Sequence, residues 1–340
     1  MSTAKGKTVL AGGVEICRIL NGMWQVSGAH GHVDPLKAAD EMLLYYDTGL
    51  TTFDMADIYG PAEEIYGLFI KKLAKERGEE AVKKVQGFTK FVPRPGPMTK
   101  QVVVAAIRES MKKMNVSKID CVQFHWWDYS DNRYLDAMVH LMDLKSQGLI
   151  GEVSLTNFDT TRMKEMTDKG VVLSSNQVQY SLIDTRPSVK MADFCLKNNI
   201  KLLTYGTLCG GLLSEKYLNQ PEPQSRSELN TASLSKYKRM IDAWGGWSLF
   251  QELLNTLDTV AKEHHVSIAN VATRYILDQP AVGGVIIGCR FGVPGCQHID
   301  SNLKTFNLKL TNSDIDKIEA VIKRGKNLMS MIGDCGDEYR

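Results

Sequence analysis

Residues 119–156, IDCVQFHWWDYSDNRYLDAMVHLMDLKSQGLIGEVSLT, contain the unit that repeats along this chain. Two short runs within it, 119–125 and 150–156, have the length and apolar content of buried strands. Between them, residues 131–147 carry apolar side chains at helical spacing. A strand, a helix and a second strand in this order predict a piece of a parallel α/β fold.

The same alternation continues in both directions along the chain. Further apolar runs predict strands near 18–23, 51–54, 83–89, 173–179, 200–205 and 283–287. Further amphipathic stretches predict helices near 35–49, 62–77, 99–115, 159–169, 187–198, 248–264 and 268–278. Eight strands that alternate with helices, with no Pro/Gly/Ser-rich linker, favour an α/β fold of the (β/α)8 TIM-barrel type over a doubly wound sheet. We expect one domain over residues 1–340.

Two segments lie outside this alternation. At the start, Thr8–Leu10 and Val14–Cys17 flank a Gly-Gly pair, which predicts an N-terminal β-hairpin. Residues 213–246 contain Pro221, Pro223 and a second Gly-Gly pair, and they predict a long loop after the seventh strand. We expect this loop to form a lid over the barrel mouth, on the C-terminal face of the barrel.

The composition of the 340 residues is that of a soluble globular protein, with 43% hydrophobic and 24% charged residues. Lys and Arg number 41 against 39 Asp and Glu, so there is no basic excess for nucleic acid. The seven cysteines never form C-x-x-C, which argues against a disulfide framework or a zinc module and favours a reducing compartment. No stretch approaches the roughly 18 apolar residues of a membrane span. We expect a cytoplasmic protein with no metal, no nucleic-acid partner and no membrane partner.

Four side chains with useful chemistry lie at the ends of three consecutive predicted strands. Asp54 closes the second strand and Tyr59 follows it, Lys90 closes the third, and His125 closes the fourth. In a (β/α)8 barrel these ends meet at one mouth, where the reactive groups lie. Taken singly, Asp54 could cap a helix, Tyr59 could pack in a loop and His125 could belong to the core.

Taken together, the four side chains suit the reduction of a carbonyl group. A general acid must protonate the carbonyl oxygen as hydride reaches the carbon, and Tyr59 is the candidate acid. The ammonium of Lys90 is expected to lower the pKa of Tyr59 from its usual value near 10. Asp54 would keep Lys90 charged, and His125 would orient the carbonyl oxygen by a hydrogen bond. The sequence contains no G-x-G-x-x-G, P-loop, G-x-S-x-G or H-E-x-x-H motif that would favour other chemistry.

These residues resemble the aldo-keto reductase family. The segment DMADIYGPAEEIYG, residues 54–67, resembles the family motif D-x-A-x-x-Y-G with its later Glu and Gly. Thr89-Lys90 resembles the T-K of the third strand, and Asp120 with His125-Trp126 resembles D-x-x-x-x-H-W. The resemblance implies a catalytic tetrad of Asp54, Tyr59, Lys90 and His125, with Tyr59 as the proton donor.

The resemblance also implies that the chain binds NADPH/NADP+ in extended form without a Rossmann fold. It assigns Asn157 and Gln177 to the nicotinamide carboxamide and Tyr205 to stacking on the ring. Arg290 is the predicted partner of the 2′-phosphate on chemical grounds, because a guanidinium suits phosphate oxygens. The chain departs from the family at Thr156-Asn157, in place of S-N, and at residues 205–208, in place of Y-S-P-L. After the eighth strand it carries extra residues around 291–295 and has Ser301 where an acidic residue often precedes Asn302. The full predicted cofactor set is Gly22, Met23, Trp24, Asp54, Thr156, Asn157, Gln177, Tyr205, Gly206, Thr207, Leu208, Gly210, Leu212, Gly288, Arg290 and Asn302.

The sequence therefore predicts an NADPH-dependent oxidoreductase that reduces an aldehyde or a ketone to an alcohol. An aromatic pocket suits a small, apolar or aromatic carbonyl compound, and its predicted residues are Trp24, Tyr59, His125, Trp126 and Trp127. One alternative is a cofactor-binding regulatory subunit that resembles potassium-channel β subunits and has little turnover. Another is an unrelated barrel enzyme, such as an aldolase or a sugar-phosphate isomerase, that uses Lys90 as a Schiff base.

Overall fold

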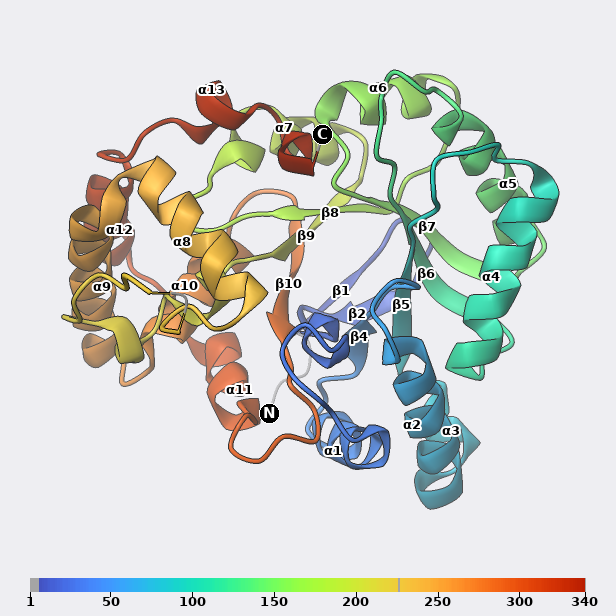
Figure 1. The fold of residues 1–340 in the computed structure, drawn as a ribbon, viewed down its shortest axis with the longest axis horizontal. Helices are drawn as coiled ribbons and strands as arrows, with labels where there is room; N and C mark the ends of the chain where they lie inside the picture. Colours follow the sequence, from blue (N-terminus) through green and yellow to red (C-terminus); the bar gives the residue numbers. More distant parts are fainter. Residues whose placement is uncertain (1–5, 226, 340) are drawn as a thin grey trace.

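The computed structural model describes residues 6–225 and 227–339, and a closed barrel of eight parallel strands forms its centre (Figure 1). The strands follow one another around the barrel in chain order, and the last pairs with the first to close it. They are β3 (Ile19–Gly22), β4 (Thr52–Asp54), β5 (Gln86–Phe91), β6 (Ile119–Phe124), β7 (Ile150–Thr156), β8 (Ser175–Gln179), β9 (Lys201–Tyr205) and β10 (Val282–Gly288). The predicted (β/α)8 fold and its eight strands are confirmed.

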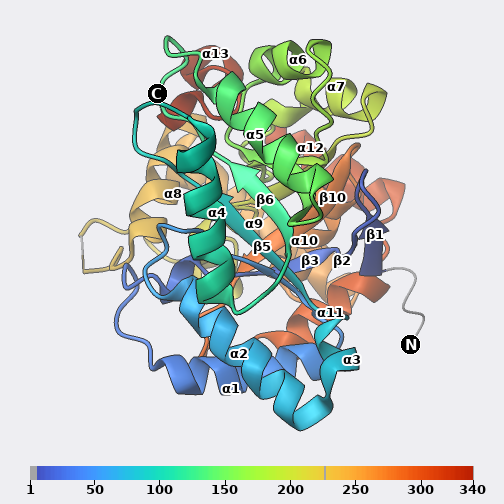
Figure 2. The ribbon, with the colours of Figure 1, turned by 90° about the vertical axis from the view of Figure 1, so that its right-hand side faces the viewer.

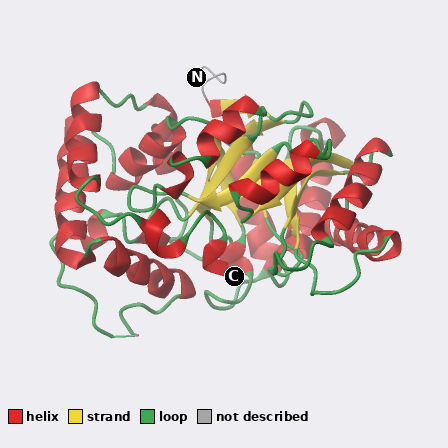
Figure 3. Cartoon of the chain, turned by 90° about the horizontal axis from the view of Figure 1, so that it is seen from above, coloured by secondary structure: helices red, strands yellow, loops and turns green. Residues whose placement is uncertain are grey.

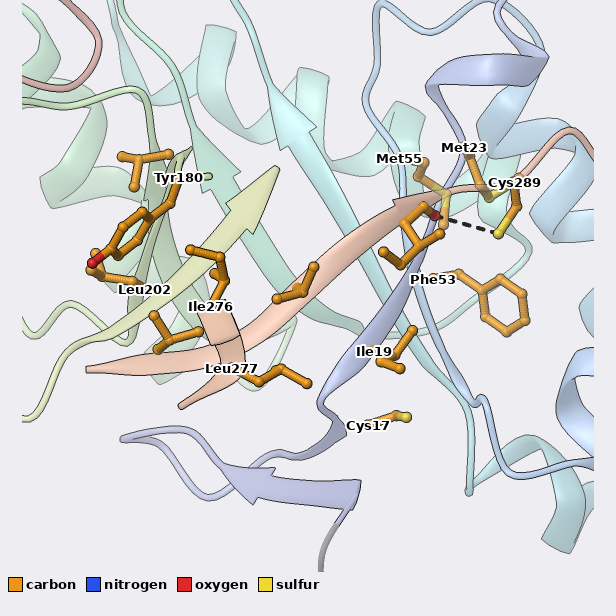
Figure 4. Close-up of a cluster of buried hydrophobic side chains, with 14 of the residues drawn as sticks. Cys17, Ile19, Met23, Phe53, Met55, Tyr180, Leu202, Ile276, Leu277 and Cys289 are labelled. Carbon is orange, nitrogen blue, oxygen red and sulfur yellow. Dashed lines mark hydrogen bonds between the residues drawn. The ribbon is translucent and has the colours of Figure 1, made fainter. Parts of the chain in front are cut away.

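Helices cover the outside of the barrel (Figures 2 and 3). Those expected from the spacing of apolar residues are α1 (Pro35–Asp47), α2 (Ala62–Arg77), α4 (Lys100–Met114), α5 (Tyr134–Ser146), α6 (Thr160–Asp168), α7 (Met191–Lys197), α9 (Gly246–Glu263) and α10 (Ile268–Leu277). Figure 4 shows part of the main core, where Ile276 and Leu277 of α10 lie near Leu202 of β9. Each of these helices buries apolar side chains, as amphipathic helices require, and α10 buries them against the barrel.

The predicted hairpin closes the end of the barrel at which the strands begin. Strand β1 (Lys7–Val9) pairs antiparallel with β2 (Glu15–Cys17). The buried carboxylate of Glu152 accepts hydrogen bonds from the backbone N–H groups of Gly12 and Val14, at 3.0 and 3.1 Å. The hairpin thus covers the end of the barrel at which the strands begin. The end at which the strands finish remains available for a functional site.

The prediction of one long loop over residues 213–246 is wrong for its second half. Helix α8 (Ala232–Trp244) lies there, with Thr231 as its N-cap and Leu234, Tyr237 and Ile241 buried on one face. The two prolines precede this helix and Gly245 follows it, so they bound the helix and do not interrupt it. Other elements outside the predicted set are α3 (Glu79–Val82), α11 (Ile299–Asn307), α12 (Asn312–Ile322) and α13 (Leu328–Ile332).

The C-terminal segment returns to the side of α6 and α7 (Figure 1). Asp334 accepts a hydrogen bond from the backbone N–H of Thr160 at 2.8 Å. The buried guanidinium of Arg186 pairs with Asp184 at 2.8 Å and with Glu338 at 2.9 Å. These contacts fix the last described residues beside the barrel. Within residues 6–225 and 227–339, no helix combines the length and the apolar character that crossing a membrane requires.

Candidate active site

Asp54 and Lys90 form a buried ion pair at the carboxyl ends of two adjacent strands. Asp54 is the last residue of β4, and its neighbour β5 runs further, which brings Lys90 level with the start of the following loop. Lys90 Nζ lies 2.6 Å from Asp54 Oδ2 and donates a second bond to the carbonyl of Met55 at 3.0 Å. Burial acts to lower the pKa of Lys90, but Asp54 and Tyr59 outweigh it and raise the pKa above its usual value. Lys90 is therefore held as an ammonium.

Tyr59 lies beside this pair, on the loop between β4 and α2. Lys90 Nζ is 4.8 Å from the centre of its ring, and the ring of Trp24 meets it edge-on at 4.9 Å. Burial raises the pKa of Tyr59, and the opposing effect of Lys90 does not cancel it. The prediction of a lowered pKa is wrong in its net direction, because it considered the ammonium without the desolvation of the phenol. Tyr59 is consequently a neutral phenol at neutral pH, the form that donates a proton.

His125 follows β6 and lies next to the same mouth. Its backbone N–H donates to the carbonyl of Phe91, the residue after Lys90. Its Nδ1 lies 3.2 Å from the carbonyl oxygen of Thr156, and the ring of Trp127 meets it edge-on at 4.4 Å. Because a carbonyl oxygen only accepts, Nδ1 carries a proton in this arrangement. The structure thus brings the four predicted catalytic residues to one end of the barrel.

Gln123 is a residue of this site that the sequence analysis missed. It lies on β6 opposite Lys90, has no exposed surface, and donates from Nε2 to Asp54 Oδ1 at 2.7 Å. Gln177 Nε2 also lies 2.7 Å from Asp54 Oδ1 and 2.7 Å from Gln123 Oε1. The available signal was an amide within a strand, two residues before His125, a spacing that points both side chains to the same face of the sheet.

A second group of polar side chains surrounds Tyr205 at the end of β9. The hydroxyl of Tyr205 donates to Asn157 Oδ1 at 2.8 Å and lies 3.0 Å from the hydroxyl of Tyr339. Lys236 Nζ, from α8, donates to that same Tyr339 hydroxyl at 2.6 Å. Tyr339 also approaches His125, with ring centres 6.3 Å apart. The C-terminal segment and α8 therefore contribute Tyr339 and Lys236 to the mouth, and neither residue was predicted.

The remaining predicted cofactor residues lie mainly on β3, on the turns after β9 and at the end of β10, and they differ in exposure. Gly22 of β3 pairs in register with Gly288 of β10, next to Trp24. Gly206 and Gly210 have φ values of 71° and 66° in the turns after β9, with Leu208 between them. The side chains of four other predicted residues are buried within the protein: Met23, Thr156, Thr207 and Leu212 (Figure 4 shows the first of these).

Two donors near the end of β10 fit an anionic ligand. Arg290 Nε is buried and has no hydrogen-bond partner among residues 6–225 and 227–339, although another nitrogen of its guanidinium donates to the carbonyl of His30. Asn302 Nδ2, on α11, is also buried without a partner in those ranges. Buried donors of this kind are costly unless a ligand supplies acceptors, as phosphate and adenine groups do.

Of the three predicted substrate tryptophans, two lie at the mouth. Trp24 contacts Tyr59, and Trp127 is 39% exposed beside His125. Trp126 lies elsewhere: it is 2% exposed, stacks on Phe124 and donates from its ring nitrogen to two carbonyls of its own loop. The structure thus places Trp126 in the core, because strand alternation points it away from the barrel axis.

Comparison with known proteins agrees with this fold and this set of residues. Residues 18–323 match the Aldo/keto reductase family, and the chain belongs to that family. Members of the family are oxidoreductases that generally use a nicotinamide cofactor and act on small carbonyl substrates.

Particular relatives are distant. The chain is 28% identical over 309 residues to the chloroplastic pyridoxal reductase of Arabidopsis thaliana, and the alignment covers 87% of this chain and 79% of the relative. It is 27% identical over 286 residues to aldo-keto reductase YhdN of Bacillus subtilis, with 82% of each chain covered. The structure of a glycerol dehydrogenase from Gluconobacter oxydans matches with a TM-score of 0.78 at 21% identity, over 95% of this chain and 96% of the other. This last similarity concerns the fold.

Proposed function

We propose that the protein is an NADPH-dependent reductase that converts an aldehyde or a ketone to an alcohol. The observation that carries the proposal is the buried Lys90–Asp54 ion pair beside the neutral phenol of Tyr59. A buried ammonium is costly unless it has a partner and a task, and here it is placed to stabilise the anion that Tyr59 becomes when it gives up its proton. An unrelated Schiff-base enzyme would need an uncharged Lys90, which the raised pKa opposes.

The bound nicotinamide would supply a hydride to the carbonyl carbon, and the chain supplies the proton and the positioning. Tyr59 donates its phenolic proton to the carbonyl oxygen, and Lys90 stabilises the resulting phenolate. Asp54 holds Lys90 in place and keeps it charged. His125 already uses Nδ1–H on the carbonyl of Thr156, so it donates to the substrate from Nε2 only as an imidazolium.

The same arrangement supports the nicotinamide site assigned to Asn157, Gln177 and Tyr205. Asn157 directly follows β7, Gln177 is the middle residue of β8 and bonds Asp54, and Tyr205 is the last residue of β9. We assign the preference for NADPH over NADH to Arg290, whose guanidinium suits the oxygens of a 2′-phosphate. The exposed face of Trp127 and the ring of Trp24 suit an apolar or aromatic carbonyl substrate.

Tyr59→Phe tests this proposal, with Tyr217→Phe as a matched control in a buried tyrosine near Trp247. Binding of NADPH and NADH is measured by fluorescence titration, and turnover is measured as NADPH oxidation over a panel of aldehydes and ketones. Loss of the general acid should reduce kcat by about 10²- to 10⁴-fold. NADPH affinity and the activity of Tyr217→Phe should stay unchanged.

Unchanged turnover in Tyr59→Phe would refute the assigned proton donor. Tight NADPH binding without turnover on any carbonyl compound would favour the regulatory alternative. Failure to bind either coenzyme would refute the proposal as a whole.

A further inference from the structure

Gln123 connects the two halves of the site through hydrogen bonds that no part of the proposed reaction requires. Its amide lies between Asp54, which holds Lys90, and Gln177, which faces the nicotinamide site in the function proposed above. All three side chains are at most 3% exposed. At such burial each polar atom depends on its protein neighbours, because water does not replace a missing partner.

The chemistry of these groups fixes the direction of each hydrogen bond. Asp54 is a carboxylate in an ion pair, so it only accepts, and both amides that contact its Oδ1 must present nitrogen to it. Gln123 therefore turns its nitrogen to Asp54 and its oxygen to Gln177. The nitrogen of Gln177 then donates one hydrogen to Asp54 and the other to Gln123 Oε1.

This geometry uses both N–H hydrogens of Gln177 inside the barrel. The oxygen of Gln177 is left as the atom that its amide can offer to a ligand, and that atom accepts hydrogen bonds. Without Gln123, the nitrogen of Gln177 would keep only one hydrogen-bond acceptor, Asp54 Oδ1. The constraint on its orientation would then be weaker, and the amide could turn to present nitrogen.

We propose that Gln123 is a positioning residue that orients the amide of Gln177, so that the site selects a nicotinamide whose ring substituent carries an N–H donor. The proposal rests on the proposed nicotinamide site. It concerns recognition of the coenzyme's carboxamide and assigns Gln123 no contact with the coenzyme.

The test compares binding of NADP+ with binding of its 3-acetylpyridine analogue, in which a methyl group replaces the amide nitrogen. Dissociation constants are measured by quenching of tryptophan fluorescence and by calorimetry. The wild-type protein should bind the carboxamide coenzyme at least about tenfold more tightly, since a buried acceptor without a donor loses this much. In Gln123→Leu the ratio should fall below about threefold, because Gln177 can then turn.

Two further variants separate orientation from general disturbance. Gln123→Glu keeps one donor for Asp54 and one acceptor for Gln177 only while its carboxyl is protonated, so its ratio should match the wild type at low pH and fall as the pH rises. Gln179→Leu is the matched control, since Gln179 is a buried glutamine of β8 that donates to a different carboxylate, Asp184, at 2.7 Å. It should also leave the ratio unchanged. If Gln123→Leu does not fold, Gln123→Met makes the same comparison.

The outcomes distinguish this proposal from the one on which it rests. A wild-type ratio near one, or a ratio that Gln123→Leu leaves unchanged, would overturn the role of Gln123 while the coenzyme site stands. A ratio in Gln123→Glu that stays as low as in Gln123→Leu over the whole pH range in which the protein is folded would overturn it as well. Failure of the wild-type protein to bind either dinucleotide would instead refute the proposed function.

Discussion

Asp57 offers a quantitative test of how burial acts on the loop that carries Tyr59. Its Oδ2 accepts a hydrogen bond from the backbone N–H of Val92 at 3.0 Å, and its own N–H donates to the carbonyl of Lys90 at 3.1 Å. Its Oδ1 is buried and has no hydrogen-bond partner in the part of the chain that the structure describes. Burial, reinforced by the nearby carboxylate of Glu63, raises the pKa of Asp57 from 3.8 to about 6.

The sign of the effect on stability follows from this direction. The folded protein binds the Asp57 proton more tightly than the unfolded chain, so the contribution to stability is complete below about pH 4. It is lost as the pH rises through about 6. A shift of about two pKa units corresponds to about 3 kcal/mol, and solvent screening at this partly exposed side chain makes that value an upper bound.

Asp57→Asn removes the ionisation and keeps an oxygen that can accept from Val92. We expect the difference in free energy of unfolding, variant minus wild type, to rise by about 1 to 2 kcal/mol between pH 4.5 and pH 7.5, because part of the effect already occurs below pH 4.5. Urea unfolding at both pH values, followed by tryptophan fluorescence, measures it. Asp128→Asn is the control, because Asp128 is exposed and hydrogen bonds from Ser130 lower its pKa. It should give no such rise.

A difference for Asp57→Asn that is independent of pH, or that falls as the pH rises, would refute the reasoning. A rise of similar size in Asp128→Asn would also refute it, since the effect would then not arise from burial.

Two further predictions concern the ends of the barrel. Arg186→Met leaves the buried carboxylate of Asp184 without its cationic partner and should cost about 3 to 5 kcal/mol of unfolding free energy. Hydrogen exchange should show faster opening of the C-terminal segment that Glu338 attaches, and protection like that of the wild type would contradict this. Glu152→Leu leaves two backbone donors of the hairpin and the hydroxyl of Ser174 without an acceptor, and should destabilise the protein by several kcal/mol. Glu152→Gln, which keeps an acceptor, should cost less, and an equal loss would count against the hydrogen-bond explanation.

The barrel could be predicted from the sequence because its strands and most of its helices have a recognisable local sequence pattern. Short apolar runs and helical spacing depend only on neighbouring residues, and they located all eight barrel strands. Helix α8 was missed although its buried residues, Leu234, Tyr237 and Ile241, recur at helical spacing. Pro221, Pro223 and the Gly245-Gly246 pair lie outside this helix, so they mark its limits and say nothing of the residues between them. For this segment the periodicity of apolar residues therefore predicts the secondary structure better than the composition does.

The site could be predicted only in part, because sequence shows residue types and strand ends but not burial or distant contacts. Lys90 and Asp54 stand out in the sequence because charged groups at the ends of apolar strands are costly to bury without a partner. The direction of the pKa of Tyr59 depends on desolvation, which is a property of the folded site. Tyr339 contacts Tyr205 although it lies 134 residues further along the chain, and no local sequence pattern predicts a contact over that separation.

Asp54 connects the features that sequence did and did not predict. One of its oxygens holds the ammonium of Lys90, and the other receives two amides, those of Gln123 and Gln177. A buried charge survives when every partner is supplied, and here three donors satisfy one carboxylate. The ammonium that supports proton transfer and the amide that would meet the coenzyme are therefore held by the same group. A change at Asp54 must alter both, whereas a change at Gln123 leaves the bond to Lys90 in place.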